Sequence, residues 1–204
     1  MNREKYSELK LQAQLFKVAP GYLTTGRDTT GQKYTSDPGV VVTARLNSNA
    51  TNGHFFVVRQ QNLNSYDTVE YSLNLPTSQG NISIPQLGGK LSLHGRDSKV
   101  HVTDFDVGGT NVLYSTAEVF TWKQFDDHKV LIVYGGPNEQ HELAISGKAG
   151  DVSFLQGSDL RVEDKGGFAV LQYNTTTQRQ IAALGDLQIY FLGKDPGKGQ
   201  YHSE

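Results

Sequence analysis

Five acidic residues are the first candidates for chemistry in this chain: Asp104, Asp106, Glu118, Glu139 and Glu142. Hydrolysis by a carboxyl pair requires two such groups that face each other across the bond to be broken, roughly 5 to 9 Å apart. Nothing in the spacing of these residues brings two of them together, so we expect solvated or turn-capping carboxylates. Glu118 is the most unusual because apolar residues flank it in an expected strand, but a single carboxylate does not make a hydrolase.

The histidines and serines give no stronger signal for a metal site or a nucleophile. His141-Glu142 lacks the second histidine, four residues on, that a helical zinc site requires. The run Asp126-Asp127-His128 lies where a hairpin turn is expected. Ser98 is close in sequence to two histidines, but no Gly-x-Ser-x-Gly motif surrounds it. We therefore expect no catalytic residue, no metal and no cofactor in this chain.

Aromatic side chains leave carbohydrate binding open, because sugar rings stack on exposed aromatic faces. The candidates are the single tryptophan, Trp122, together with Tyr114 and Tyr66. The competing interpretation is that Trp122 packs in a core or hairpin with its polar edge hydrogen-bonded. We favour packing and keep a ligand platform as the alternative.

The composition excludes several classes of protein. A net charge of −2 over 204 residues, with no basic run, does not indicate a basic surface for nucleic-acid binding. No apolar stretch approaches the roughly 20 residues that span a bilayer, so no membrane partner is expected. The polar start, Met1 to Lys5, predicts that this sequence has no signal peptide. Cysteine is absent, which excludes disulfides. Three Asn-x-Ser/Thr tripeptides are candidates for N-glycosylation, at Asn49, Asn81 and Asn174.

One helix is expected, over residues 1–17. Its apolar residues recur at spacings of three and four and form one stripe, made of Tyr6, Leu9, Ala13 and Phe16. Pro20-Gly21 ends the pattern. Such a helix must pack against other parts of the protein. It packs either on the region that follows or on a preceding domain, of which it would be the last segment.

The rest of the chain has the pattern of an all-β protein. Short apolar or alternating runs recur at intervals of roughly 10 residues, and turn signals such as Gly88-Gly89 and Gly108-Gly109 separate them. About fourteen strands are too many for one simple sandwich. We expect a subdomain of antiparallel hairpins over 18–108, an immunoglobulin-like sandwich over 109–193, and a flexible tail over 194–204.

Several motifs in a fixed order resemble one known family. They are Arg3–Gln12, Pro20–Thr24, Gly53–Arg59, Leu75–Ser78, Ile84–Gly89, Gly95–Trp122, Val133–Gly136, His141–Ser146 and Gly185–Leu187. Together they resemble the second domain of fungal glycoside hydrolase family 35 β-galactosidases, from Arg3 to about Leu192. The resemblance implies hairpins leading into an immunoglobulin-like subdomain, with residues 1–17 continuing from a catalytic barrel that is missing here.

The resemblance also implies a function for the whole. The parent would be secreted and glycosylated, and would release terminal β-linked galactose with retention through two glutamates on the barrel. No catalytic residue can therefore be carried over. Its implied partners are the catalytic barrel and the downstream β domains of the parent. We expect a non-catalytic structural domain, and the alternative is an accessory module that binds a galactoside.

Overall fold

The computed structural model describes residues 3–48, 53–157 and 159–194. Within them it contains one α-helix and seventeen strands. The predicted all-β class with one short N-terminal helix is confirmed. None of the described helices is both long enough and apolar enough to pass through a bilayer.

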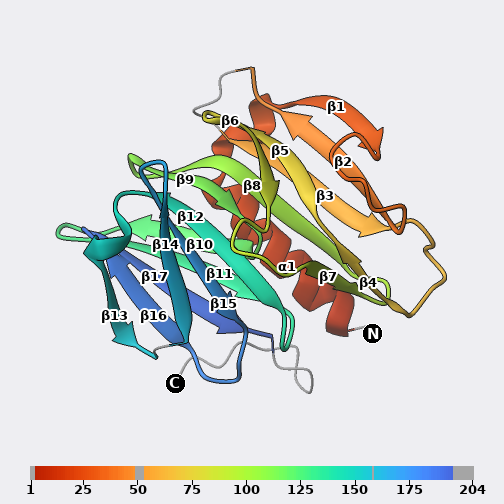
Figure 1. Ribbon diagram of the computed structural model, residues 1–204. Coiled ribbons are helices and arrows are strands. Elements are labelled where there is room, and N and C mark those ends of the chain that lie inside the picture. The colour runs from red at the N-terminus through yellow and green to blue at the C-terminus, as the bar shows by residue number, and fades with distance from the viewer. Residues whose placement is uncertain (1–2, 49–52, 158, 195–204) are drawn as a thin grey trace.

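The largest element is a sheet of eight antiparallel strands (Figure 1). In spatial order they are β1 (Gly26–Gly31), β2 (Val40–Leu46), β3 (His54–Gln60), β8 (Ser98–Val107), β9 (Thr110–Ser115), β12 (Gln140–Ser146), β15 (Phe168–Asn174) and β14 (Leu160–Lys165). Strands β8 and β9 form a hairpin whose turn contains the expected boundary between residues 108 and 109. The sheet continues across this boundary, so the two expected subdomains share it. Their division stays a prediction.

A second sheet of five strands covers part of the first. Its order is β10 (Glu118–Gln124), β11 (Lys129–Gly135), β17 (Leu187–Gly193), β16 (Gln180–Leu184) and β13 (Val152–Gln156). Strands β11 and β17 run parallel, whereas the other neighbours are antiparallel. The immunoglobulin-like description of the second half stays a prediction.

Two small two-stranded sheets complete the β structure. One pairs β4 (Thr68–Tyr71) with β7 (Leu91–His94), and the other pairs β5 (Leu73–Thr77) with β6 (Gly80–Ile84). The four strands of these two small sheets are too few to bury their apolar side chains by themselves. These side chains pack instead against the eight-stranded sheet.

The eight-stranded sheet consequently has a hydrophobic core on each face. On β12, Leu143 and Ile145 belong to the core shared with the five-stranded sheet, whereas Ala144 belongs to the core under the hairpins. The same alternation places Phe55 in the first core and Phe56 in the second. Because strand side chains alternate between faces, such strands are apolar at consecutive positions.

The helix α1 (Arg3–Val18) packs on the edge strand β10 through a stripe that differs from the predicted one. Leu11 and Leu15 are buried, with Ala19 directly after the helix. Tyr6, Leu9 and Phe16, by contrast, are exposed. At roughly 100° per residue, the two stripes lie on nearly opposite sides of the helix. The predicted apolar stripe is present, and of its two possible docking surfaces the following β region is not the one it contacts, because that region packs on Leu11 and Leu15 instead.

Candidate functional site

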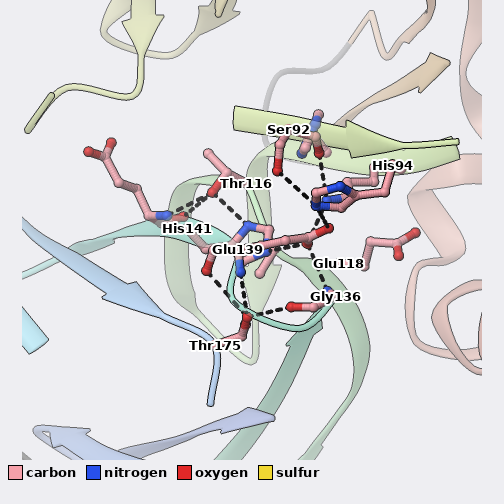
Figure 2. Close-up of polar contacts among 12 residues, drawn as sticks. Ser92, His94, Thr116, Glu118, Gly136, Glu139, His141 and Thr175 are labelled. Carbon is pink, nitrogen blue, oxygen red and sulfur yellow. Dashed lines mark hydrogen bonds and ion pairs between the residues drawn. The ribbon is translucent and has the colours of Figure 1, made fainter. Parts of the chain in front are cut away.

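A buried carboxylate, Glu139, is the centre of the most unusual polar site in the protein (Figure 2). It lies in the short connection from β11 to β12, where Asn138 has a positive φ of 58°. Two glycines make room for it. A Cβ atom on Gly136 would lie 2.5 Å from Glu139 Oε1, and one on Gly135 would collide with the ring of His141. The connection therefore requires glycine at both positions.

One oxygen of Glu139 has three partners. Oε2 lies 2.5 Å from Lys99 Nζ, and accepts hydrogen bonds from the backbone N–H of Gly136 at 2.7 Å and from His141 Nε2 at 3.0 Å. Oε1 accepts no hydrogen bond from the described residues. His94 Nε2 lies 3.6 Å from Oε1, which is too long for a hydrogen bond. Half of this buried carboxylate is thus unsatisfied.

The protonation states follow from these contacts. Burial alone would raise the pKa of Glu139, but the hydrogen bond from His141 and the charge of Lys99 outweigh it and lower this pKa to about 2. Burial lowers the pKa of His141 against the opposing effect of Glu139. At neutral pH the site therefore holds an ionised carboxylate and a neutral imidazole.

The backbone around Glu139 is fixed by a threonine from the next strand. Thr175 Oγ1 accepts the N–H of Glu139 at 2.9 Å and donates to the carbonyl of Gly136. Its own N–H donates to the Glu139 carbonyl at 2.9 Å. These bonds hold the connection to the end of β15, so the carboxylate has little freedom to move.

A second buried histidine lies beside this site, on β8. His101 Nε2 is 2.7 Å from the hydroxyl of Tyr71 on the β4–β7 hairpin. Burial lowers the pKa of His101 to about 3, and the charge of Lys99 adds to the effect. The ring is therefore neutral over most of the pH range.

A cavity of about 180 Å³ lies against Glu139. Lys99 and Glu139 line its buried part, while Arg96, Asp97 and Ser98 line it from the exposed turn between β7 and β8. Gln12 of α1, together with Glu118 and Lys194, completes the polar lining. The cavity thus lies where the N-terminal helix, the β7–β8 turn and the end of β17 meet.

This arrangement is better suited to binding than to acid–base catalysis. A general acid in sugar hydrolysis needs a carboxyl with a raised pKa. The pKa of Glu139 is lowered instead, and its strongest contacts are to structural partners. Within residues 3–48, 53–157 and 159–194, no group of three or more histidine or acidic side chains could hold a metal ion.

The other acidic candidates mostly hold the backbone of loops. Glu142 is completely buried and accepts the N–H groups of Gln86 and Leu87 at 2.7 and 2.8 Å, as well as the hydroxyl of Tyr114 at 2.8 Å. Asp104 is buried too, and accepts the N–H of Ser78 at 2.7 Å. The expectation of turn-capping carboxylates fits these residues. Glu142, Asp104 and Glu139 are buried, so of the two alternatives, solvated or turn-capping, only turn-capping applies to them.

The remaining acidic candidates lie closer to solvent. Asp106 is exposed and accepts the N–H of Gly109 at 2.8 Å, which caps the β8–β9 turn. Glu118 is half-buried, accepts the N–H of Val100 at 3.3 Å and lines the cavity. Sequence spacing gave no sign that Glu118 and Glu139 share a cavity. The adjacent glycines 135 and 136 were the one available signal, because paired glycines often mark a close approach of other groups.

The three aromatic candidates lie in different environments. Trp122 is half-buried on β10, and its indole N–H donates to the carbonyl of Val18 at 3.0 Å, so it anchors the end of α1. Tyr114 is fully buried and has no face for a sugar. Tyr66 is 75% exposed, and the guanidinium of Arg96 lies over its ring. Only Tyr66 could act as an exposed platform, and its ring is close to the cavity mouth.

The other candidates fall where no site forms or where the structure gives no description. The turn at 126–128 is an exposed hairpin end, as expected. Ser98 is exposed at the cavity mouth. Asn81 and Asn174 are both exposed, whereas Asn49 lies outside the described residues. The expected tail is also outside them, apart from Lys194.

Comparison with known proteins identifies the family. The family model described as β-galactosidase, domain 2, matches residues 22–197. The chain belongs to this family. "Beta-galactosidase A" of Penicillium sp is 49% identical over 198 residues, which cover 96% of the chain and 20% of that protein. "Beta-galactosidase A" of Aspergillus niger is also 49% identical and that of Aspergillus oryzae is 47% identical, each over 96% of the chain and 19% of the relative.

The resemblance to the second domain of fungal β-galactosidases, expected from the sequence motifs, is confirmed. The chain spans about a fifth of the length of the relatives that it matches. The two glycines that make room for Glu139 are part of one motif of this resemblance, Val133–Gly136. In this β-galactosidase domain 2, that motif thus has a physical role in enclosing a charge.

Proposed function

We propose that this β-galactosidase domain 2 is a non-catalytic structural domain of a secreted fungal enzyme of glycoside hydrolase family 35. It packs against the catalytic barrel of its parent, which hydrolyses terminal β-D-galactosyl residues, and it positions the downstream β domains. The relatives named β-galactosidase are about five times longer than the chain, which leaves room for those parts.

The outer face of α1 is the observation that carries this proposal. Tyr6, Leu9 and Phe16 are 61%, 63% and 43% exposed, although they form one apolar stripe. The inner face of the same helix is already occupied by the contact with β10. A helix that is apolar on two opposite sides is typical of an element buried between two bodies. We therefore assign the outer side of α1 to the contact with the catalytic barrel.

The non-catalytic role is supported by how the acidic residues are used. Glu142 and Asp104 are held by loop N–H groups, and Glu139 is held by Lys99 and His141. The lowered pKa of Glu139 makes this carboxyl a poor proton donor to a leaving group. The proposal therefore places the acid and the nucleophile of the reaction in the barrel.

Secretion is supported by the surface and by the family resemblance. Asn81 and Asn174 are exposed, so glycosylation at either position would not require unfolding. The proposal assigns both asparagines as acceptor sites in the secreted parent. Mass spectrometry of the parent from a fungal host tests this assignment, and unmodified peptides at both sites would overturn it.

The docking role is tested by replacing Leu9 and Phe16 together by glutamine, which keeps the helix propensity of α1. In the isolated chain Leu9 is 63% exposed, whereas Phe16 is 43% exposed and its ring lies 4.6 Å from that of Tyr22, so we expect the free energy of unfolding to fall by only about 1 kcal/mol. In the intact parent each side chain would lose burial worth about 1.5–3 kcal/mol, so its thermal midpoint falls. Leu63→Gln, at a residue 59% exposed outside the helix, is the matched control. An equal response of chain and parent would refute the proposal.

A further inference from the structure

We propose that a groove beside the β5–β6 hairpin holds the first sugar residues of a glycan attached to Asn81. The inference rests on the proposed function, which makes Asn81 a glycosylation site, and deepens it by giving that glycan a defined place on the protein. The groove has a volume of about 350 Å³. It is lined by residues 33–36 of the β1–β2 connection, by residues 72–74 and by Ser83.

The attachment site and the groove share one face of the β5–β6 hairpin. The apolar side chains of the hairpin face the other way, toward the core beneath it, and they are Leu73, Leu75, Ile82 and Ile84. Because side chains alternate along a strand, Asn81 and Ser83 both point outward, and both are exposed. Ser83 lines the groove and pairs with Asn74, which lines it too. Two positions along a strand span about 7 Å, so a glycan on Asn81 begins beside the groove.

The lining of the groove is held in place by hydrogen bonds within the protein. The N–H of Asn74 donates to the carbonyl of Tyr34 at 2.9 Å. Thr35 Oγ1 donates to the carbonyl of Ser72 at 2.9 Å, and the N–H of Ser72 donates to Asp37 Oδ2 at 2.8 Å. These bonds hold the β1–β2 connection against β5. The groove is therefore formed before a glycan enters it, which lowers the ordering cost of binding.

The chemistry of the lining suits a neutral sugar. Ser36, Asn74 and Ser83 are exposed, and their hydroxyl and amide groups can both donate and accept hydrogen bonds, as sugar hydroxyls do. Lys33 is the one charged residue of the lining, and its ammonium is paired with the carboxylate of Asp28 at 2.8 Å. The groove thus offers no unpaired charge that would select an ion over a sugar.

The same lining favours a tethered sugar over a free one. Its one aromatic side chain, Tyr34, is buried and has the ammonium of Lys33 over its ring, so a sugar has no exposed aromatic face to stack on. A tethered glycan needs little affinity, because attachment raises its local concentration to about the millimolar range. Sites that enclose small ligands measure about 300–1,000 Å³. The groove therefore takes about one or two sugar residues, and the outer branches of the glycan extend into solvent.

The test measures how fast an endoglycosidase that cuts between the first two sugar residues releases the glycan of Asn81. The whole chain is secreted from a fungal host and kept folded, and mass spectrometry of the glycopeptides follows the release. Asn74→Tyr fills the groove and leaves the sequence Asn81-Ile82-Ser83 intact. Ser153→Tyr, at an exposed position of β13, is the matched control. We expect Asn74→Tyr to accelerate release about tenfold, because the first sugars lose their contacts, and the control to leave the rate unchanged.

The outcomes separate the groove from the proposed function. If Asn81 carries a glycan and Asn74→Tyr releases it no faster than the unmodified chain, then the groove does not hold the glycan, whereas the glycosylation site stands. An unmodified Asn81 would overturn both. If Asn74→Tyr does not fold, Ser36→Tyr blocks the groove from the β1–β2 connection and must give the same acceleration. The docking role of α1 is independent of all these results.

Discussion

Replacement of His101 by glutamine is expected to flatten the acid side of the stability profile of this domain. His101 is completely buried on β8, and its ring nitrogen contacts the hydroxyl of Tyr71. Burial, reinforced by the nearby charge of Lys99, lowers its pKa from 6.5 to about 3. Glutamine keeps an amide that can bond to Tyr71 but has no proton to gain.

The sign and the size follow from proton linkage. Below pH 6.5 the unfolded chain protonates His101 while the folded protein does not, so stability is lost as the pH falls toward 3. Each pH unit in this window is worth about 1.4 kcal/mol per histidine. Between pH 6.5 and 4.5 this one side chain therefore accounts for a loss of about 2.3 kcal/mol, because the unfolded histidine is only half protonated at the upper end of the window. His141, whose pKa is also lowered, adds to the loss in the unmodified protein.

Glu139 does not obscure this window. Its pKa is lowered from 4.5 to about 2, so its contribution is complete above pH 4.5 and is lost only as the pH falls from there toward 2. Denaturant unfolding at several pH values between 7 and 4.5 therefore isolates the histidines. The expected result is a slope that is lower by about 1.4 kcal/mol per pH unit in His101→Gln.

Tyr71→Phe is the matched control for this experiment. It removes the hydrogen bond to His101 but keeps the ring, so stability should fall by about 1 kcal/mol at every pH with the slope unchanged. If His101→Gln shows the same pH dependence as the unmodified protein, then the buried ring already binds a proton in this range. That outcome would refute the reasoning.

Three further predictions concern the buried polar groups and the helix. Glu139→Gln should lower the free energy of unfolding by about 3–5 kcal/mol, because it leaves Lys99 buried and unpaired. Adding Lys99→Met to this variant should recover part of the lost stability. A loss of less than about 1 kcal/mol, measured by denaturant unfolding, would contradict this prediction. Glu142→Gln should lower the free energy of unfolding by about 2–4 kcal/mol, since a side-chain NH₂ would face the loop N–H groups. Hydrogen exchange at the amides of residues 86 and 87 should then accelerate. Unchanged exchange at these amides would show that Glu142 does not hold this loop. Trp122→Phe removes the hydrogen bond to Val18 and should lower the stability of the end of α1 by about 1 kcal/mol. Hydrogen exchange at amides near Val18 should become faster, and unaltered exchange would contradict the role of Trp122 as an anchor.

The architecture of this domain is well encoded in local patterns. Alternation along strands such as β12 and turn glycines such as Gly108-Gly109 depend on neighbouring residues alone, so they can be recognised in the sequence. The pairing of strands is different. Strand β11 lies between β10 and β17, and β17 comes from the far end of the sequence. Such long-range pairing, which includes a parallel pair, has no local signature.

The face on which α1 docks also could not be predicted. Both sides of the helix are apolar, one through Tyr6, Leu9 and Phe16 and the other through Leu11 and Leu15. Periodicity identifies an apolar stripe but does not say which body covers it. The sequence pattern identifies the stripe that contains Tyr6, Leu9 and Phe16, whereas the β region packs on the smaller leucine stripe. The stripe that the β region leaves exposed is therefore a second surface of α1 that is available for contact.

The candidate site was the least predictable feature. Neither Glu139 nor the residues next to it are apolar, so the local sequence does not indicate burial. Its partner Lys99 lies 40 positions earlier in the chain. A buried charge depends on tertiary partners that compensate for its desolvation. The expectation that acidic residues are solvated therefore failed where β8, the β11–β12 connection and β15 converge. The cavity beside them arises from the same convergence.

The central claim, that α1 joins this domain to the preceding part of a β-galactosidase, is tested most directly by photo-crosslinking. A photoreactive amino acid is placed at position 9 of this domain within the intact parent, and the crosslinked peptides are identified by mass spectrometry. The account predicts a crosslink from position 9 to residues of the catalytic barrel, and none to the barrel from the control position 63. If position 9 reacts only with its own domain or with solvent, the outer face of α1 is not an interface and the structural role proposed for this domain is contradicted.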